Sequence, residues 1–244
     1  MKDEDDTMIY VISDLHGYSL ESIQDFLGKV GFCSDDTLYI LGDVIDRGTD
    51  GVKLLRWMML QRNVEFILGN HEEMLLKSGY LDELAEDSDS DSTYRKFNVY
   101  NTWVSNGGKI TADDLCTTNK RVILCIMDYL MNVPLYKEIT VGGKKFILTH
   151  SGLGGFKKDK SMEDYSSYDL LWTRPNMNTR YFDDAMVIFG HTPTVYMGDG
   201  QLGKILKTDT WINIDVGVAV GQEPAILRLD DLKEFYYKDY IGNN

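Results

Sequence analysis

Two acidic residues and an arginine lie close together in the segment LGDVIDRG, residues 41–48. Asp43 and Asp46 are three residues apart, and Arg47 follows at once, directly after an apolar run. Two carboxylates can bind a divalent cation, and a guanidinium can hold phosphate oxygens through paired hydrogen bonds. A turn with an ion pair, or a cap for a helix near residue 50, would use the same residues. The segment alone leaves these alternatives open.

Four further polar segments follow apolar runs in the same way. They read DLHG, GNHEE, HSGL and GHTP, and they contain Asp14, His16, Asn70, His71, His150 and His191. All four histidines of the chain lie in these segments. Histidines that only fill a core would not be confined to such positions, so the placement favours one site with metal or proton-transfer chemistry.

The apolar runs themselves predict the elements that position these residues. Each run has 4 to 6 residues, and most are rich in Val, Ile, Tyr or Phe, which favours strands. The expected strands are 8–13, 37–41, 64–68, 145–149, 186–189, 211–214 and 225–229. Helical patterns run from Leu20 to Val30 and over 50–62 and 72–86, so the chain opens as β-α-β-α-β-α, an α/β pattern. Side chains at the ends of such strands converge on one crevice.

The middle of the chain has a different character. Residues 120–132 predict a helix that ends before Pro134, and we expect a mostly helical insertion over about 80–135. The acidic run 82–91 predicts a solvated loop or a flexible helix end. No internal repeat or linker is visible, so we expect one domain over residues 1–244.

Composition excludes several classes of function. A net charge of -14 argues against binding long nucleic acid, which needs a basic face, but allows a small phosphorylated substrate. No apolar run approaches the ~18 residues of a membrane span, and the acidic start MKDEDDT is unlike a secretory signal. Three cysteines without metal-binding spacing are typical of a reducing compartment, so we expect a cytoplasmic protein with no membrane partner.

Taken together, the five blocks resemble a known family. D-x-H-G, G-D-x-x-D-R-G, G-N-H-[DE] and two later histidines occur here in order, as in the phosphoprotein phosphatases of the calcineurin-like metallophosphoesterase superfamily. The compact length is similar to that of the bacterial-type serine/threonine phosphatases. The resemblance implies an α/β (α+β) four-layer sandwich, in which two mixed β-sheets are flanked by helices.

The same resemblance implies a role for each matching residue. Two divalent metal ions, manganese or alternatively iron, zinc or a mixed pair, would be held by Asp14, His16, Asp43, Asn70, His150 and His191. Asp43 would bridge the two ions. His71 would be the general acid, oriented by Asp46, while the substrate phosphate would be bound by Arg47, Arg174 and Asn70. A hydroxide shared by the two metals would attack phosphorus in line.

Some of these roles have alternatives. His71 could be a metal ligand instead of the acid, because adjacent Asn and His cannot be separated by sequence. Asn70 could be only a turn residue, and Arg174 an ordinary surface arginine. Asp215, in the segment NIDVG, is expected to be structural or to support a ligand.

We therefore predict a metal-dependent phosphomonoester hydrolase, a serine/threonine protein phosphatase, acting on a phosphoprotein or a small phosphorylated substrate. The first alternative is a symmetrical diadenosine tetraphosphate hydrolase. Those enzymes usually have ARG where this chain has DRG, so Asp46 favours the protein phosphatase. A phosphatase acting on nucleic-acid ends is disfavoured by the negative charge. A non-catalytic module that retains a metal is the alternative of another class.

Overall fold

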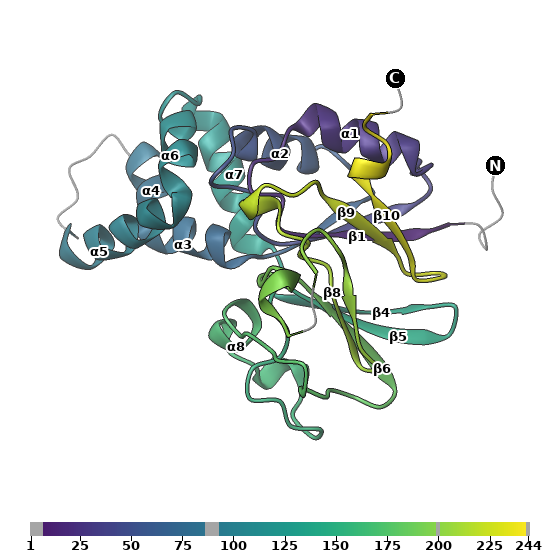
Figure 1. Cartoon of the computed structure of the whole chain (residues 1–244). Helices are drawn as coiled ribbons and strands as arrows, with labels where there is room; N and C mark the ends of the chain where they lie inside the picture. Colours follow the sequence, from purple (N-terminus) through teal and green to yellow (C-terminus); the bar gives the residue numbers. More distant parts are fainter. Residues whose placement is uncertain (1–6, 86–92, 199–200, 243–244) are drawn as a thin grey trace.

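The computed structural model describes residues 7–85, 93–198 and 201–242, and it contains two five-stranded sheets packed against each other (Figure 1). The first sheet has the strand order β10-β9-β1-β2-β3. Its strands are β1 (Ile9–Ile12), β2 (Thr37–Leu41), β3 (Val64–Ile67), β9 (Ala225–Arg228) and β10 (Lys233–Tyr236). β1, β2 and β3 are parallel, whereas β9 and β10 extend the sheet in antiparallel fashion.

The second sheet has the strand order β4-β5-β6-β8-β7. Its strands are β4 (Tyr136–Val141), β5 (Lys144–Thr149), β6 (Ala185–Phe189), β7 (Leu206–Lys207) and β8 (Trp211–Asn213). β5, β6 and β8 are parallel, and β4 and β7 are antiparallel edge strands. Both sheets are therefore mixed, as the sequence predicts.

The core is arranged in layers because side chains alternate along each strand. Val11 and Leu41 of the first sheet pack against Leu148 and Ile188 of the second. Their neighbours Tyr10, Ile12 and Leu38 point to the opposite face, where helices cover the first sheet. The outer face of the second sheet packs against residues that include Leu153, Tyr165 and Leu170. This arrangement confirms the predicted four-layer sandwich.

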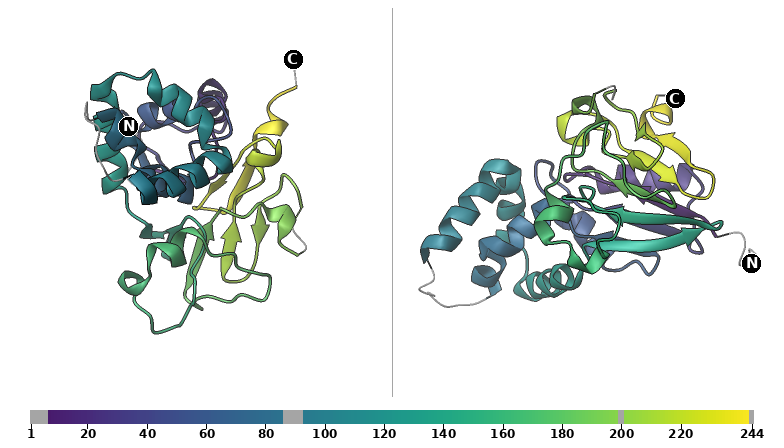
Figure 2. Two further views of the ribbon diagram at one scale, coloured as in Figure 1. Left: turned by 90° about the vertical axis from the view of Figure 1, so that its left-hand side faces the viewer. Right: turned by 90° about the horizontal axis from the view of Figure 1, so that it is seen from below.

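The described residues form eight α-helices, and several of them lie in a group beside the first sheet (Figure 2). They are α1 (Leu20–Lys29), α2 (Gly51–Met58), α3 (Asn70–Ser78), α4 (Tyr80–Ala85), α5 (Thr93–Trp103), α6 (Lys109–Cys116), α7 (Lys120–Asn132) and α8 (Ser167–Leu171). α4 to α7 occupy the segment predicted to be a helical insertion. Residues 86–91 of the predicted acidic run lie outside the described residues, while 82–85 belong to α4. The single-domain assignment stays a prediction.

All seven predicted strands are confirmed, but the sequence did not reveal three others. β4 contains only exposed and half-buried residues and has no apolar run, because it lies at the edge of the sheet. It pairs with β5 through the two-residue turn Gly142-Gly143, where both residues have positive φ. β7 and β10 are also edge strands. Within the described residues, none of the helices combines the length and apolar character that crossing a bilayer requires.

Candidate active site

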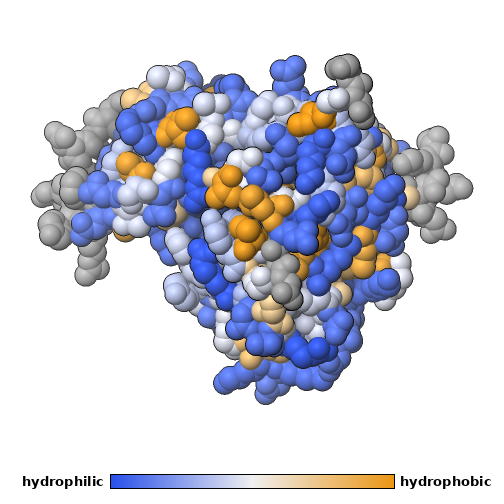
Figure 3. Space-filling model, viewed as in Figure 1, coloured by the Kyte–Doolittle hydropathy of each residue, from blue (hydrophilic) through white to orange (hydrophobic). Residues whose placement is uncertain are grey.

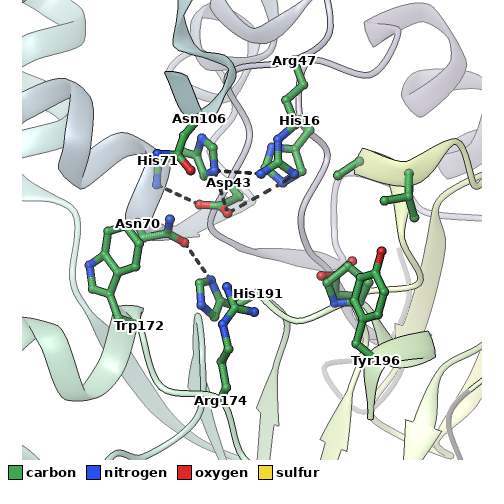
Figure 4. Close-up of a pocket in the computed structure, with 14 residues that line it drawn as sticks. His16, Asp43, Arg47, Asn70, His71, Asn106, Trp172, Arg174, His191 and Tyr196 are labelled. Atoms are coloured by element: carbon green, nitrogen blue, oxygen red, sulfur yellow. Dashed lines mark hydrogen bonds and ion pairs between the residues drawn. The ribbon is translucent and has the colours of Figure 1, made fainter. Parts of the chain in front are cut away.

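The predicted site residues emerge at the carboxyl ends of parallel strands in both sheets. Asp14 and His16 follow β1, the segment with Asp43 and Arg47 follows β2, and Asn70 and His71 begin α3 directly after β3. His150 follows β5 and His191 follows β6. The segments meet at a cavity of about 370 Å³, which is lined by residues of four of the five blocks (Figure 4). His150, from the remaining block, contacts Asp43 and Asn70 of this lining. The sequence-based expectation of one shared crevice is thus confirmed.

Two groups of side chains at this cavity have the arrangement of metal sites. His16, Asp43 and His71 form one group, and Asp43, His150 and His191 form the other. Asp43 belongs to both, as expected of a bridging ligand. Asp43 Oδ2 lies 3.8 Å from Nε2 of His16, and its Oδ1 lies 3.4 Å from Nε2 of His150. Asn70 Oδ1 lies 2.8 Å from His150 Nε2 and 2.8 Å from His191 Nδ1, so the second group includes the predicted amide.

The imidazole contacts support metal binding. Nδ1 of His150 donates to the carbonyl of Leu41 at 2.8 Å, and Nδ1 of His16 donates to the carbonyl of Ile45 at 3.3 Å. Ligating histidines normally anchor one ring nitrogen on such a carbonyl and bind metal with the other. His191 Nε2 is buried and has no hydrogen-bond partner among the described residues. Buried polar atoms rarely lack a partner, so these donors fit divalent metal ions of the kind that imidazole and carboxylate bind.

Burial and mutual charge determine how these groups ionise. Burial lowers the pKa of His16 to about 3 and the pKa of His191 to about 2, which leaves both rings neutral, the form that binds metal. Burial would raise the pKa of Asp43, but the charges of His150 and His71 hold it well below its usual range. Burial would lower the pKa of His150, but the Asp43 carboxylate raises it to about 10. Asp43 is therefore an ionised carboxylate paired with the His150 cation, and a divalent metal ion could take the place of that positive charge.

Strained backbone is concentrated at the site. Among the described residues, seven that are not glycine have positive φ, and six of them are Asp14, His16, Asp43, Asp46, Arg47 and His191. Such conformations cost about 1–3 kcal/mol each and persist where the surrounding structure enforces them. Because these six residues all lie in the predicted motifs, the strained turns coincide with the site, which is typical of functional residues.

Asp14 occupies a position beside the two metal-binding groups. Its buried carboxylate accepts the backbone N–H of His191, at 3.1 Å to Oδ1 and 3.0 Å to Oδ2. Burial raises its pKa to about 6. His71, in contrast, lies within the first group, although its expected role is that of the acid. Asp14 as a ligand remains a prediction, and both roles of His71 stay open.

His71 and Asp46 form a buried pair, as the resemblance implies. Nδ1 of His71 lies 2.6 Å from Oδ2 of Asp46, and both side chains are almost fully buried. A carboxylate at Nδ1 fixes the tautomer with the proton on Nδ1, so that Nε2 is directed into the cavity. Nε2 lies 3.3 Å from Nη2 of Arg47, on the same side as the metal-binding groups.

The two predicted phosphate-binding arginines enter the cavity from opposite sides (Figure 4). Arg47 Nη1 donates to His16 Nε2 at 3.1 Å, next to the first group. Arg174 Nη1 donates to Thr192 Oγ1 at 2.9 Å, next to His191. The structure therefore places Arg174 in the cavity and not among ordinary surface arginines.

Several other residues that support or line the site were given no role from the sequence. Glu72 is buried and accepts the backbone N–H groups of Asp43, Val44, Ile45 and Gly69, so it holds the turn after β2 against α3. It stands within the G-N-H-[DE] block, which was the available signal. Asn106, Trp172 and Tyr196 line the cavity but lie in no recognised block. Asp215, which was expected from the sequence to be structural or to support a ligand, also lines the cavity, and burial together with nearby Asp14 raises its pKa well above its usual range.

Sequence comparisons place the chain in a family. The profile of the calcineurin-like phosphoesterases matches residues 7–210. A symmetrical bis(5'-nucleosyl)-tetraphosphatase from Chromobacterium violaceum is 40% identical over 202 residues, which cover 78% of this chain and 58% of that protein. An asymmetrical bis(5'-nucleosyl)-tetraphosphatase from Anoxybacillus flavithermus is 24% identical over 93% of this chain and 92% of its own length. A symmetrical enzyme from Neisseria meningitidis is matched over only 30% of its length.

Solved structures share the fold. A protein assigned as a diadenosine tetraphosphatase superposes with a TM-score of 0.64 at 17% identity, covering 94% of this chain and 92% of that one. A protein serine/threonine phosphatase from Saccharomyces cerevisiae gives 0.61 at 13% identity, covering 92% of this chain and 73% of that one. The profile match, the two mixed sheets and the two metal-binding groups agree, and the chain belongs to the calcineurin-like phosphoesterase family.

Proposed function

We propose that this metal-dependent phosphoesterase hydrolyses small oligophosphate-bridged nucleotides, with dinucleoside tetraphosphates as the substrate class. The observation that carries the proposal is the pair of arginines on opposite sides of the cavity. One guanidinium can already hold a phosphate through paired hydrogen bonds, and a second one allows a chain of phosphates to contact Arg47 and Arg174 together while it crosses the metal-binding groups.

The remaining lining residues fit the nucleoside ends of such a substrate. Trp172 and Tyr196 both line the cavity, and the side chain of Tyr196 is 69% exposed. An aromatic ring at the edge of a phosphate site can stack a base, which is worth about 1–3 kcal/mol. Val220 lines the same cavity, and an apolar area interrupts the polar surface near the centre of the face in Figure 3. The volume of about 370 Å³ is within the usual range for small-molecule sites, ~300–1,000 Å³.

The names of the relatives support the same substrate class. The Chromobacterium and Anoxybacillus proteins are both named as tetraphosphatases, one symmetrical and one asymmetrical. They favour the alternative over the protein phosphatase that the sequence first predicted. The fold does not distinguish the two, because both kinds of enzyme superpose on this chain.

In this mechanism each residue has a defined task. Divalent ions held by Asp43, His16, His150, His191 and Asn70 would polarise phosphoryl oxygens and activate water for attack on phosphorus. Arg47 and Arg174 neutralise the charge of neighbouring phosphates and hold the chain in place. Burial would lower the pKa of His71, but the carboxylates of Asp43 and Asp46 raise it above its usual value and favour the imidazolium. The imidazolium delivers its Nε2 proton to the departing oxygen and becomes neutral with its proton on Nδ1, while Asp46 keeps the ring in the required orientation.

A protein serine/threonine phosphatase is the second candidate, and one observation favours it. Asp46 is present in the DRG segment and forms the buried pair with His71. An alkoxide leaving group needs a proton donor more than a phosphate leaving group does, because alkoxides are far more basic. A complete donor pair is therefore best suited to phosphoserine or phosphothreonine.

The two candidates separate in one experiment. The Mn²⁺-loaded protein is incubated with diadenosine tetraphosphate or with a phosphoserine peptide, and products are resolved by anion-exchange chromatography. We expect faster turnover of the dinucleotide, yielding either two ADP from a central cut or ATP and AMP from an outer cut. Asp43→Asn should abolish it, whereas Asp159→Asn, at an exposed carboxylate, should not. Preferential release of phosphate from the peptide would overturn the proposal in favour of the second candidate.

A further inference from the structure

The helical insertion contacts Asp46, the partner of His71, directly. Trp103, at the end of α5, donates its Nε1–H to Oδ2 of Asp46 at 2.8 Å. Thr111, in α6, donates its hydroxyl to Oδ1 of the same carboxylate at 2.7 Å. The Thr111 oxygen also accepts the backbone N–H of Asp46 at 2.9 Å. All three side chains are almost completely buried, so these bonds are shielded from water.

These bonds leave Asp46 little freedom. Oδ2 is shared by His71 and Trp103, while Oδ1 is bound by Thr111, so both oxygens have partners and the plane of the carboxylate is fixed. The backbone of Asp46 has a φ of 72°, which is strained for a residue with a side chain. The Thr111 hydroxyl binds both the backbone and the side chain of Asp46, and thereby opposes relaxation of this turn.

The same insertion holds the next residue. The backbone N–H of Arg47 donates to the carbonyl of Gly107 at 3.1 Å, and Arg47 has a φ of 69°. Gly107, in the kinked segment η2 (Val104–Gly108) between α5 and α6, has a φ of 107°, and a Cβ there would lie 2.7 Å from Cγ of Arg47. Only glycine can make this close approach without displacing the arginine.

From these contacts we infer that the insertion is a positioning element for catalysis, in which Trp103 and Thr111 act through Asp46 to aim His71 at the leaving group. The inference rests on the proposed role of His71 as proton donor. Neither residue touches the cavity, because neither is among its lining residues, so they would affect protonation of the leaving group without binding substrate. The contacts to Asp46 span 57 and 65 residues of sequence.

The test uses two leaving groups of nearly the same shape. p-Nitrophenolate departs readily without a proton, whereas phenolate gains much from a proton donor. For Thr111→Val in the Mn²⁺-loaded protein, we expect kcat with phenyl phosphate to fall about 30-fold and kcat with p-nitrophenyl phosphate to fall less than about 3-fold, with KM unchanged. Thr111→Ser, which keeps the hydroxyl, should restore the wild-type ratio. Thr210→Val, which removes a buried hydroxyl in another part of the chain, should leave the ratio unchanged.

A second readout does not depend on turnover. In the metal-free protein, the Nδ1 proton of His71 bonded to Asp46 should give a low-field proton NMR resonance, identified by its loss in His71→Asn. Thr111→Val and Trp103→Phe should shift or broaden this resonance, whereas Trp211→Phe, which removes an indole donor bonded to the Thr179 carbonyl, should not. If Trp103→Phe does not fold, the resonance in Thr111→Val still tests the inference.

Equal losses with both aryl phosphates, or an unchanged resonance, would overturn the inference. A result that contradicts the proposed dinucleotide substrate would be distinguishable from this one. The wild-type protein would then hydrolyse aryl phosphates without cleaving diadenosine tetraphosphate, and the leaving-group ratio would still report on Trp103 and Thr111.

Discussion

The backbone N–H of His191 donates to both carboxylate oxygens of Asp14, although 177 residues separate the two in the sequence. Asp14 follows β1 of the first sheet, and His191 follows β6 of the second. The contact therefore joins the two sheets at the site, between two residues that both have positive φ. Gly190 makes this approach feasible, because a Cβ at that position would overlap Oδ2 of Asp14.

Replacing Gly190 by alanine should therefore damage the metal site. The added methyl group would push Asp14 away from His191, and we expect Mn²⁺ affinity measured by isothermal titration calorimetry to fall about 10- to 100-fold, as for other residues that orient ligands. Gly28→Ala is the matched control, since a Cβ at Gly28 meets nothing within 4 Å. Equal affinities of the two variants would contradict the structural reading of this contact.

His16 and His191 should each make the metal-free protein less stable as the pH falls. Burial lowers the pKa of His16 to about 3 and that of His191 to about 2, whereas in the unfolded chain both titrate near 6.5. Below pH 6.5 these two residues therefore bind more protons in the unfolded chain than in the folded one, so they contribute stability above pH 6.5 that is progressively lost toward pH 3. Urea unfolding in a chelating buffer from pH 7 to pH 5 measures this slope.

The variant His191→Gln isolates that contribution from the acidic residues, which also titrate. Glutamine cannot take up a proton, so the free energy of unfolding should depend less steeply on pH than in the wild type. An identical slope in both proteins would mean that His191 is not buried in its neutral form.

Arg174 should contribute more to binding of oligophosphates than of single phosphates. For Arg174→Ala we expect KM for diadenosine tetraphosphate to rise about tenfold, equivalent to ~1.4 kcal/mol, while KM for p-nitrophenyl phosphate changes little. Arg180→Ala removes an arginine that forms an exposed ion pair with Asp209 and should change neither value. A loss of similar size for both substrates would show that the two arginines do not bind separate phosphates.

Tyr196 should recognise the base of the nucleotide. Tyr196→Ala should raise KM for diadenosine tetraphosphate about tenfold, because a stacking contact of ~1–3 kcal/mol is lost, but should not affect inorganic tripolyphosphate, which has no base. Tyr168→Ala is the control, because Tyr168 is equally exposed, at 69%, but does not line the cavity. An equal effect on both substrates would show that Tyr196 stabilises the loop after β6 and does not bind the base.

The sequence by itself determined the parallel strands and the chemical groups at their ends. Short apolar runs predict buried strands, and polar residues directly after them must gather where parallel strands end, so His16, Asp43, Asn70, His150 and His191 could be assigned to one crevice. Edge strands such as β4 escaped this reasoning, because their exposed faces remove the apolar pattern.

Only the tertiary structure decided which groups touch. The bonds of Trp103 and Thr111 to Asp46, and the carbonyl of Gly107 beside Arg47, join segments whose separation in the sequence carries no signal of contact. The placement of Tyr196 at the cavity likewise depends on how the loop after β6 packs. Local propensity and hydrophobic period act over a few residues, whereas these contacts arise from the packing of whole layers, so they become visible only when the chain is folded.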